Sequence, residues 1–168
     1  ATAEAAIRLN WIDLPNSSIS LLPQLEKLNK WSSNLGHQKI ILCGMGGSSL
    51  APEVFGKSYK KAITVLDSTD PEQIAYALPN DLKSCLIIIG SKSGSTIETA
   101  SHKAFFENEF KNAGLNPINH IVVITDPNSP LDQNARLSGY QVVNADPNVG
   151  GRFSALSAFG LVPAYLMG

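Results

Sequence analysis

The strongest constraint on the fold is a series of five short apolar runs separated by longer segments. Each run is rich in β-branched residues and apolar at successive positions, which is typical of strands that are buried on both faces. Such strands occur in parallel sheets, where each connection between strands needs a crossover that is usually a helix. The runs are "KIILCG" (39–44), "AITVLD" (62–67), "SCLIIIG" (84–90), "HIVVIT" (120–125) and "YQVVN" (140–144).

The segments between and before the runs have helical features. Leucines and a tryptophan recur at spacings of three and four over residues 22–35, and Gly36 is a typical helix stop. Ser129 and Pro130 are typical of a helix N-cap and first helical position, and Gly139 of a helix end. A further apolar stripe ends at Gly114, and its predicted members are Ile97, Ala100, Ala104, Phe106, Phe110 and Ala113.

This alternation of strands and helices predicts an α/β fold, a doubly wound three-layer α-β-α sandwich around a five-stranded parallel sheet. The 168 residues have the length of one domain with a lead-in. We expect residues 1–38 to form a lead-in with one helix, and residues 39–168 to form the sandwich. Because the sequence stops within the apolar stretch "LVPAYLMG", we expect the domain to be truncated at its C-terminus.

Charge and composition argue against several classes of partner. The net charge of -1 gives no electrostatic reason to expect nucleic acid or an anionic membrane, and no apolar run is long enough to span a bilayer. Metal ligands are not clustered, so we predict neither a metal nor a cofactor. Cys43 and Cys85 lie inside apolar runs, which favours buried free thiols and a reducing, cytoplasmic setting. The first ten residues also lack the layout of a secretory signal.

The loops at the carboxyl ends of the predicted strands are where a ligand is expected in such a sheet. The loop after the first run is "GMGGSSLAPE" (44–53). Gly44, Gly46 and Gly47 let the backbone approach a ligand closely. Ser48 opens the next helix, whose N-terminus favours an anion.

The same loop partly matches a dinucleotide-binding motif. Gly44 and Gly46 fit the first two glycines of G-x-G-x-x-G, and Asp67 ends the second run where a ribose-binding carboxylate would stand. The third glycine position is occupied by Ser49. A dinucleotide-binding oxidoreductase domain is therefore one alternative interpretation.

The loop after the third run, "SKSGSTIET" (91–99), crowds small hydroxyl donors at the start of a predicted helix. A phosphate monoester presents several acceptor oxygens and two negative charges, so converging hydroxyls and amides suit it. Gly94 lets the backbone come close, and Lys92 could add a compact cation. The alternative is a capped, serine-rich turn without a ligand. The hydroxyl donors are Ser91, Ser93, Ser95 and Thr96.

The loop after the fifth run, "DPNVGGRFSALSAFG" (146–160), places a cation on a glycine turn. Gly150 and Gly151 precede Arg152, which is predicted to start an apolar helix. An arginine at the ligand edge could clamp an anionic group or stabilise developing oxyanion charge. The alternative is a surface arginine that caps a turn.

The titratable side chains contribute little to a catalytic interpretation. His37 and His120 stand at the amino ends of predicted strands, away from the ligand edge, and His102 is expected to be solvated on a helix. Three aspartates lie at the ligand edge, where turn formation and helix capping explain them better than catalysis. They are Asp67, Asp126 and Asp146.

Three loops taken together resemble the sugar isomerase (SIS) domain of the glucose-6-phosphate isomerase family. "GMGGSSLAP", "SKSGSTIET" and "VGGRFS" stand for the family patterns G-x-G-G-S, S-K-(S/T)-x-(S/T)-T-x-E-T and V-G-G-R-(F/Y)-S, in the same order. The resemblance runs from about residue 39 to the end and implies a flavodoxin-like SIS fold. "SKSGST" departs from the "SKTFTT" of many members and is similar to divergent forms, including transaldolase-fused and bifunctional phosphoglucose/phosphomannose types. The preferred epimer is therefore left open.

The resemblance also implies roles for individual residues. Ser91, Ser93 and Thr96 would hold the sugar phosphate, with Lys92 beside them. In the same way, Arg152 and Glu98 would be the catalytic positions, with Arg152 facing the reacting end of the sugar and Glu98 acting as a partner near a catalytic histidine. The residues that would border the sugar are Gly46, Gly47, Ser48 and Gly151.

The activity implied by the resemblance is interconversion of glucose 6-phosphate and fructose 6-phosphate through an enediolate, which needs a base and a cation. In the family the base is a glutamate of a second SIS domain, so we expect this chain to bind phosphosugar but to turn it over little by itself. The family also implies a homodimer. A non-catalytic phosphosugar-sensing SIS module is the other alternative, although no helix-turn-helix or basic surface is evident.

Overall fold

A computed structural model describes residues 8–168 and confirms the predicted α/β class. Five strands form one sheet in the order β2-β1-β3-β4-β5, and every neighbouring pair is parallel. The strands lie at the five predicted apolar runs, with ends shifted by up to two residues. They are β1 (Lys39–Gly44), β2 (Thr64–Leu66), β3 (Cys85–Gly90), β4 (Ile121–Thr125) and β5 (Gln141–Asn144).

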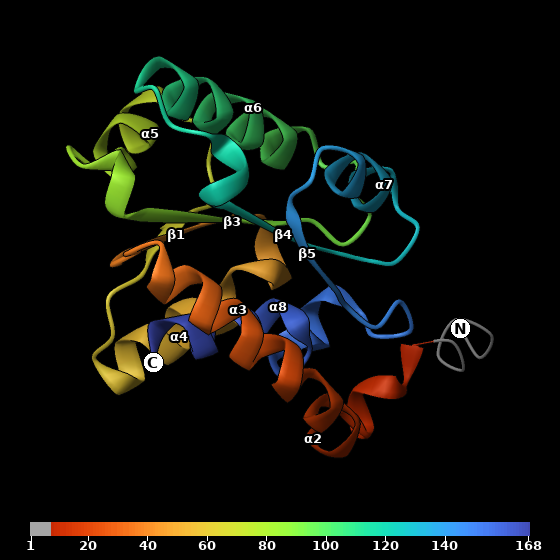
Figure 1. The fold of residues 1–168 in the computed structure, drawn as a ribbon. Helices are drawn as coiled ribbons and strands as arrows, with labels where there is room; N and C mark the ends of the chain where they lie inside the picture. Colours follow the sequence, from red (N-terminus) through yellow and green to blue (C-terminus); the bar gives the residue numbers. More distant parts are fainter. Residues whose placement is uncertain (1–7) are drawn as a thin grey trace.

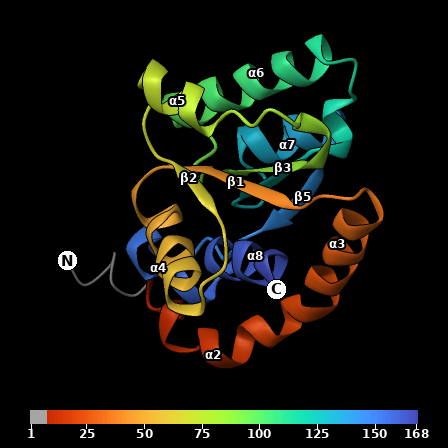
Figure 2. The same ribbon diagram turned by 90° about the vertical axis from the view of Figure 1, so that its left-hand side faces the viewer.

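Helices cover both faces of the sheet, as Figures 1 and 2 show. One layer contains α5 (Pro71–Ala77), α6 (Ile97–Asn112) and α7 (Pro130–Leu137). The opposite layer contains α3 (Leu22–Asn34), α4 (Leu50–Tyr59) and α8 (Ala158–Met167), with the short α2 (Leu14–Ser17) before α3. The molecule is therefore the predicted three-layer sandwich.

The core is divided by the sheet because alternate side chains of a strand point to opposite faces. Leu86 and Ile88 of β3 pack in a cluster that includes Leu25 and Leu28 of α3. Ile87 and Ile89 of the same strand pack on the other side, in a cluster that includes Phe106 and Phe110 of α6. Every residue of β3 is buried, which makes it the central element of the fold.

Helix α6 buries a different face from the one that the predicted stripe indicated. Ile97 is 73% exposed, and Ala100, Ala104 and Ala113 are exposed as well. Since an α-helix has about 3.6 residues per turn, the first three members of the stripe lie on the opposite side of the helix from Phe106 and Phe110. The stripe therefore joined residues from two faces, and only the face with the phenylalanines is buried.

The prediction that His102 is solvated is wrong for the same reason. His102 shares the buried face of α6 with Thr99, and its side chain is fully buried. Its Nε2 lies 2.9 Å from the backbone carbonyl oxygen of Ser68, in the loop after β2. The Nδ1 atom of His102 has no hydrogen-bond partner.

Two further predictions concern the state of the cysteines and membrane-spanning segments. Cys43 and Cys85 are buried free thiols, as predicted, and burial raises the pKa of the Cys43 thiol. No helix within residues 8–168 is both long enough and apolar enough to cross a bilayer.

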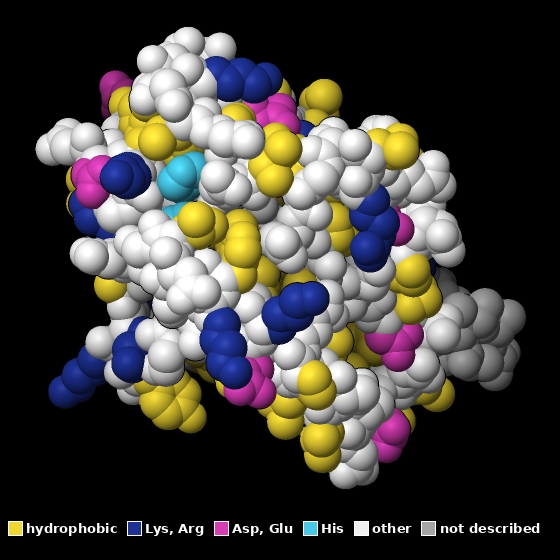
Figure 3. All heavy atoms as spheres, in the orientation of Figure 1, with side chains coloured by type: hydrophobic (Ala, Val, Ile, Leu, Met, Phe, Trp, Pro, Cys, Tyr) yellow, Lys and Arg dark blue, Asp and Glu magenta, His cyan; other side chains and the backbone are white. Residues whose placement is uncertain are grey.

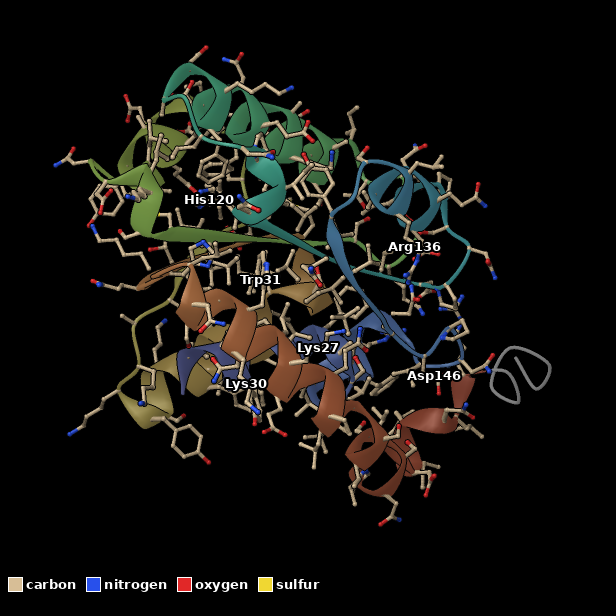
Figure 4. All side chains as sticks on the ribbon, viewed as in Figure 1. Lys27, Lys30, Trp31, His120, Arg136 and Asp146 are labelled. Carbon is tan, nitrogen blue, oxygen red and sulfur yellow. The ribbon has the colours of Figure 1, made fainter. Side chains whose placement is uncertain are left out.

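His37 and His120 meet at the amino ends of β1 and β4, away from the ligand edge, as predicted. His37 Nε2 lies 3.2 Å from His120 Nδ1, and His120 Nδ1 lies 3.1 Å from the carbonyl oxygen of Cys85. The His120 ring also stacks on Phe110, and Trp31 of α3 packs edge-on against His37. Figure 4 shows Trp31 between α3 and the sheet and His120 on the other side of β3, toward α6, and Figure 3 shows histidine atoms at the surface of this face.

This histidine pair predicts acid-sensitive stability. Burial first, and the neighbouring His120 second, lower the pKa of His37 from 6.5 to about 4. The unfolded chain therefore takes up a proton at His37 below about pH 6.5, whereas the folded chain does so only near pH 4. We expect the free energy of unfolding to fall as the pH is lowered through this window. Chemical denaturation between pH 4 and pH 7 should show a weaker pH dependence for His37→Asn than for the wild type. An equal dependence in both proteins would contradict this assignment.

Candidate functional site

A cavity of about 400 Å³ lies at the carboxyl ends of the central strands. The chain leaves β1 toward β2 on one side, whereas β3 lies on the other side of β1, so the strand order reverses between β1 and β3. The register pairs Gly44 with Gly90, so the loops after these two strands start side by side. Ligands of open α/β sheets bind at this kind of reversal, and the predicted ligand edge therefore contains a real cavity.

The loop after β1 forms the first wall. Gly46 has a positive φ of 59° and begins a 3-10 turn, η3 (Gly46–Ser48), that leads into α4. Gly47 and Ser48 line the cavity, whereas Gly46 does not. The Ser48 hydroxyl donates a hydrogen bond to the carbonyl oxygen of Met45 at 2.9 Å, which holds the turn closed.

The loop after β3 forms the wall that carries the hydroxyl groups. Ser91, Ser93 and Thr96 all line the cavity. Ser91 Oγ donates to Thr96 Oγ1 at 3.0 Å, so the hydrogen of the Thr96 hydroxyl is available for a ligand. Thr96 is also the N-cap residue of α6, and its side chain makes no capping hydrogen bond.

Two further residues shape the tip of this loop. The hydroxyl oxygens of Ser93 and Ser95 lie 2.9 Å apart, and the Ser95 backbone N–H donates to Ser93 Oγ at 3.2 Å. Gly94 has a φ of 70°, and a Cβ placed there would lie 2.9 Å from the Leu131 Cβ of α7. Glycine is therefore required for the tip to pack against α7.

Lys92 lines the cavity, but its charge is already balanced. Its Nζ lies 2.7 Å and 2.9 Å from the two carboxylate oxygens of Asp126. It also donates to the backbone carbonyl oxygens of Asp146 at 3.3 Å and Pro147 at 3.2 Å. Burial raises the pKa of Asp126, and the hydrogen bond from Lys92 opposes that rise. Lys92 thus connects the loop after β3 to the loops after β4 and β5.

The loop after β5 closes the cavity from the side of α8. Gly151 lines it, at the start of η6 (Gly151–Leu156). The Ser154 hydroxyl of η6 donates to the carbonyl oxygens of Gly151 at 2.5 Å and Gly47 at 3.2 Å. Arg152 is therefore the second residue of a 3-10 helix. The apolar α-helix that it was predicted to start begins only after the Ser157 cap, at Ala158.

The two predicted catalytic residues stand outside the cavity wall. Arg152 is exposed, and its guanidinium carbon lies 5.8 Å from the centroid of the Phe153 ring. Glu98, in the first turn of α6, is partly buried. Neither side chain is among those that line the cavity.

Several lining residues were not predicted from the sequence. Asp126 was noticed at the ligand edge but interpreted as a turn residue, and only its contact with Lys92 shows its place in the cavity wall. Arg8 lies in the lead-in, where no sequence signal connects it to the strands. The lining residues not assigned to a site from the sequence are Arg8, Met45, Gly90, Asp126, Pro147 and Phe159. Within residues 8–168, no three His, Cys, Asp or Glu side chains gather as metal ligands would.

The contact between Gly47 and Gly151 yields a prediction. A Cβ at position 47 would lie 2.3 Å from the Gly151 carbonyl oxygen and 2.8 Å from the Arg152 backbone nitrogen. We expect Gly47→Ala to lower the free energy of unfolding by about 1–3 kcal/mol, the usual cost of overpacking. Gly151→Ala is the matched control, since its Cβ would meet nothing within 4 Å. Equal losses for the two variants in urea denaturation would contradict the close contact.

Known proteins resemble this chain in sequence. The family described as "Phosphoglucose isomerase" matches residues 27–168. The glucose-6-phosphate isomerase of a Cyanothece species is 42% identical over 138 residues, covering 77% of this chain and 26% of that protein. The enzyme of the same name from Thermus thermophilus is 34% identical over 173 residues, covering 98% of this chain and 40% of that protein. The chain thus spans well under half the length of these curated relatives.

Solved structures also resemble this chain. A hypothetical protein from Thermus thermophilus superposes with a TM-score of 0.81 at 34% identity, over 95% of this chain and 39% of that one. A glucose-6-phosphate isomerase from Chlamydia trachomatis gives a TM-score of 0.70 at 30% identity, over 83% of this chain and 29% of that one. Both the sequence match over residues 27–168 and these structural matches lead to one conclusion: the chain belongs to the phosphoglucose isomerase family.

Proposed function

We propose that this chain forms the phosphosugar-binding part of an isomerase that interconverts glucose 6-phosphate and fructose 6-phosphate. The observation that carries this proposal is the gathering of the Ser91, Ser93 and Thr96 side chains around one cavity at the reversal of strand order. Hydroxyl donors at the start of a helix suit a doubly charged ester. Family membership, and the name glucose-6-phosphate isomerase carried by curated relatives, supply the reaction.

We assign the phosphate to the loop after β3 and the sugar to the other two loops. Thr96 has a hydroxyl hydrogen available, because its oxygen accepts the bond from Ser91. Gly47, Ser48 and Gly151 would border the sugar, since they line the same cavity from the loops after β1 and β5. Gly46, which does not line it, would contribute through the positive-φ turn that places Ser48.

Isomerisation through an enediolate needs a cation near the reacting carbons and a base to move the proton. Arg152 follows the cavity-lining Gly151 directly, and we assign it the stabilisation of enediolate charge. Glu98 would act as a positioning partner for a histidine. Among the cavity-lining residues that the structure describes, Asp126 is the one carboxylate, and Lys92 holds it.

For this reason we place the base in another part of a longer protein. The curated relatives are long enough to hold it, since this chain covers 26% of the Cyanothece protein and 40% of the Thermus one. We expect the 168-residue chain to bind phosphosugar with little turnover. An assay of fructose 6-phosphate conversion checks this, and robust turnover would contradict it.

The remaining parts of the proposal concern organisation and location. We propose that residues 1–38 are a lead-in and residues 39–168 an SIS domain. Of the described part of the lead-in, α3 packs on this domain, because Leu25 and Leu28 belong to the core on the α8 side. We further propose a homodimer for the longer protein, testable by its mass in solution. A cytoplasmic location is proposed as well, and the competing compartment is a plastid, because one relative from Arabidopsis thaliana is named as chloroplastic.

A ligand panel tests the proposed function against its alternatives. Because a ligand that binds only the folded state raises its stability, glucose 6-phosphate and 6-phosphogluconate should raise the Tm of the chain in proportion to the logarithm of their concentration. Unphosphorylated glucose and NAD should leave it unchanged. A rise with NAD and none with the phosphosugars would favour the dinucleotide-binding alternative. Binding by the longer protein without isomerisation would favour the phosphosugar-sensing module.

A second test addresses the phosphate donors directly. Thr96→Val removes the hydroxyl and keeps the shape of the side chain. We therefore expect the binding free energy of glucose 6-phosphate to become less favourable by about 1–3 kcal/mol, the value of a hydrogen bond to a charged group. Ser101→Ala is the control, because its hydroxyl bonds to the Ile97 carbonyl on the same helix. Titration with glucose 6-phosphate, followed by NMR, measures the dissociation constants of both variants. An unchanged dissociation constant for Thr96→Val would remove Thr96 from the site.

A further inference from the structure

Helix α4 turns its large apolar side chains outward, which is unusual for a helix that covers a sheet. The residues that it buries are Pro52 and Gly56, whereas Leu50, Val54 and Tyr59 are between 58% and 75% exposed. Leu50 and Val54 are four positions apart and therefore share one face of the helix. A surface helix normally turns its large apolar residues toward the core. The outer face of α4 therefore has the composition of a contact surface.

A groove of about 400 Å³ lies between α4 and α8, next to this face. Figure 2 shows α4 at the edge of its layer, with α8 beside it. The lining of the groove is mostly apolar, and its apolar side chains come from α4, η6 and α8. They are Phe55, Tyr59, Leu156, Leu161, Ala164 and Met167. We call this groove, together with Leu50 and Val54, the α4–α8 surface.

The α4–α8 surface starts at the wall of the cavity that we assign to the phosphosugar. Leu50 is the first residue of α4 and comes two positions after Ser48, which lines that cavity. Leu156 is the last residue of η6, whose first residue, Gly151, lines the same cavity. A protein segment that packs on the α4–α8 surface would therefore border the cavity.

The opposite layer offers no comparable surface within residues 8–168. The helices α5, α6 and α7 each expose one large apolar side chain, namely Tyr76, Ile97 and Leu137. Single exposed apolar residues are common on proteins and need no partner. The clustering of such residues along α4 and α8 is what distinguishes the α4–α8 surface.

The needs of the cavity indicate what covers this surface. Among the cavity-lining residues that the structure describes, Asp126 is the one carboxylate, and it forms an ion pair with Lys92 at 2.7 Å. Isomerisation needs a base beside the sugar, so another part of the protein has to come next to the cavity. The curated relatives are long enough to hold such a part, because this chain covers 26% of the Cyanothece protein and 40% of the Thermus one. Burial of apolar area would hold that part in place.

We propose that the α4–α8 surface is the docking site for the part of the longer protein that supplies the base. The occupant presents an apolar face to the groove. Acidic side chains at its edge would complement Lys60 and Lys61, which follow Tyr59 and are exposed. This inference rests on the proposed isomerase function, and it adds to the cavity a neighbouring surface through which the site is completed.

Labelling of introduced cysteines tests the proposal, because the native thiols of Cys43 and Cys85 are buried. Leu137→Cys is the matched control for Val54→Cys, since Leu137 is 88% exposed on α7, in the opposite layer. Both variants should react rapidly with a maleimide in the 168-residue chain. In the longer protein, Val54→Cys should react about tenfold more slowly or less, because a covered position reacts only when its contact opens, whereas Leu137→Cys should keep its rate. Equal rates for Val54→Cys in the two proteins would overturn the proposal.

A second copy of the chain is the competing occupant, and it gives a different result. Val54→Cys would then lose reactivity as the concentration of the 168-residue chain is raised, and the chain would have the mass of a dimer in solution. Protection in the longer protein that disappears when it dissociates into monomers would also assign the surface to a second copy. Either result would overturn the proposal, whereas protection that persists in the monomer supports it.

Val54→Lys separates docking from ligand binding. Val54 does not line the cavity, so this variant of the 168-residue chain should bind glucose 6-phosphate as the wild type does. In the longer protein its kcat should fall about tenfold or more, because a charge buried in an apolar contact opposes docking, and Leu137→Lys should keep the wild-type kcat. Wild-type kcat in Val54→Lys would overturn the docking site and leave the proposed function standing. Absence of isomerisation by the wild-type longer protein, with Val54→Cys still protected, would overturn the proposed function and with it the base-supplying role of the occupant.

Discussion

The pairing of β1 with β3 is the constraint on which the rest of the structure depends. The two strands are parallel and paired along their whole length, from Lys39 with Cys85 to Gly44 with Gly90. Because both end in a glycine at the same level, two loops start side by side with little side-chain bulk between them. Strand β2 then continues the sheet on one side and β4 on the other. The cavity at this edge is thus a direct result of strand register.

Short-range contacts between loops turn that edge into a defined site. The absence of a side chain at Gly47 lets η3 approach η6, and the Ser154 hydroxyl joins the two by bonding to the carbonyl oxygens of Gly47 and Gly151. On the other side, the Lys92–Asp126 ion pair joins the loops after β3 and β4. The hydroxyl groups of Ser91 and Thr96 are already oriented by their mutual bond. These contacts fix the walls of the cavity relative to one another.

The sequence was informative wherever a local pattern decides the structure. Runs of successive apolar residues identified all five strands, since such runs are typical of strands covered on both faces. The prediction of an N-cap at Ser129 was also correct, because capping is local: the Ser129 hydroxyl accepts a hydrogen bond from the nearby Asp132 N–H. The glycine and serine loops could be placed at one edge because parallel strands share a direction. The class of fold and the position of the cavity could therefore be predicted from these local patterns.

Features that depend on tertiary packing were not predictable. The orientation of α6 was misjudged because alanine and isoleucine on its outer face resemble core residues, whereas the buried Thr99 and His102 are polar. Lys92 looked like a free cation because Asp126, its partner, is 34 positions away. Arg8 gave no signal at all, since its place depends on contacts such as that of Leu9 with Val149. Local patterns carry no information about such pairs.

The contact between Asn10 and Asp146 spans 136 positions of sequence, and it has a consequence for how the molecule is assembled. Closing so large a loop costs chain entropy and is slow compared with forming neighbouring helices and strands. A contact of this sequence separation raises the contact order of the fold, which favours slower folding than in a chain whose contacts are all local.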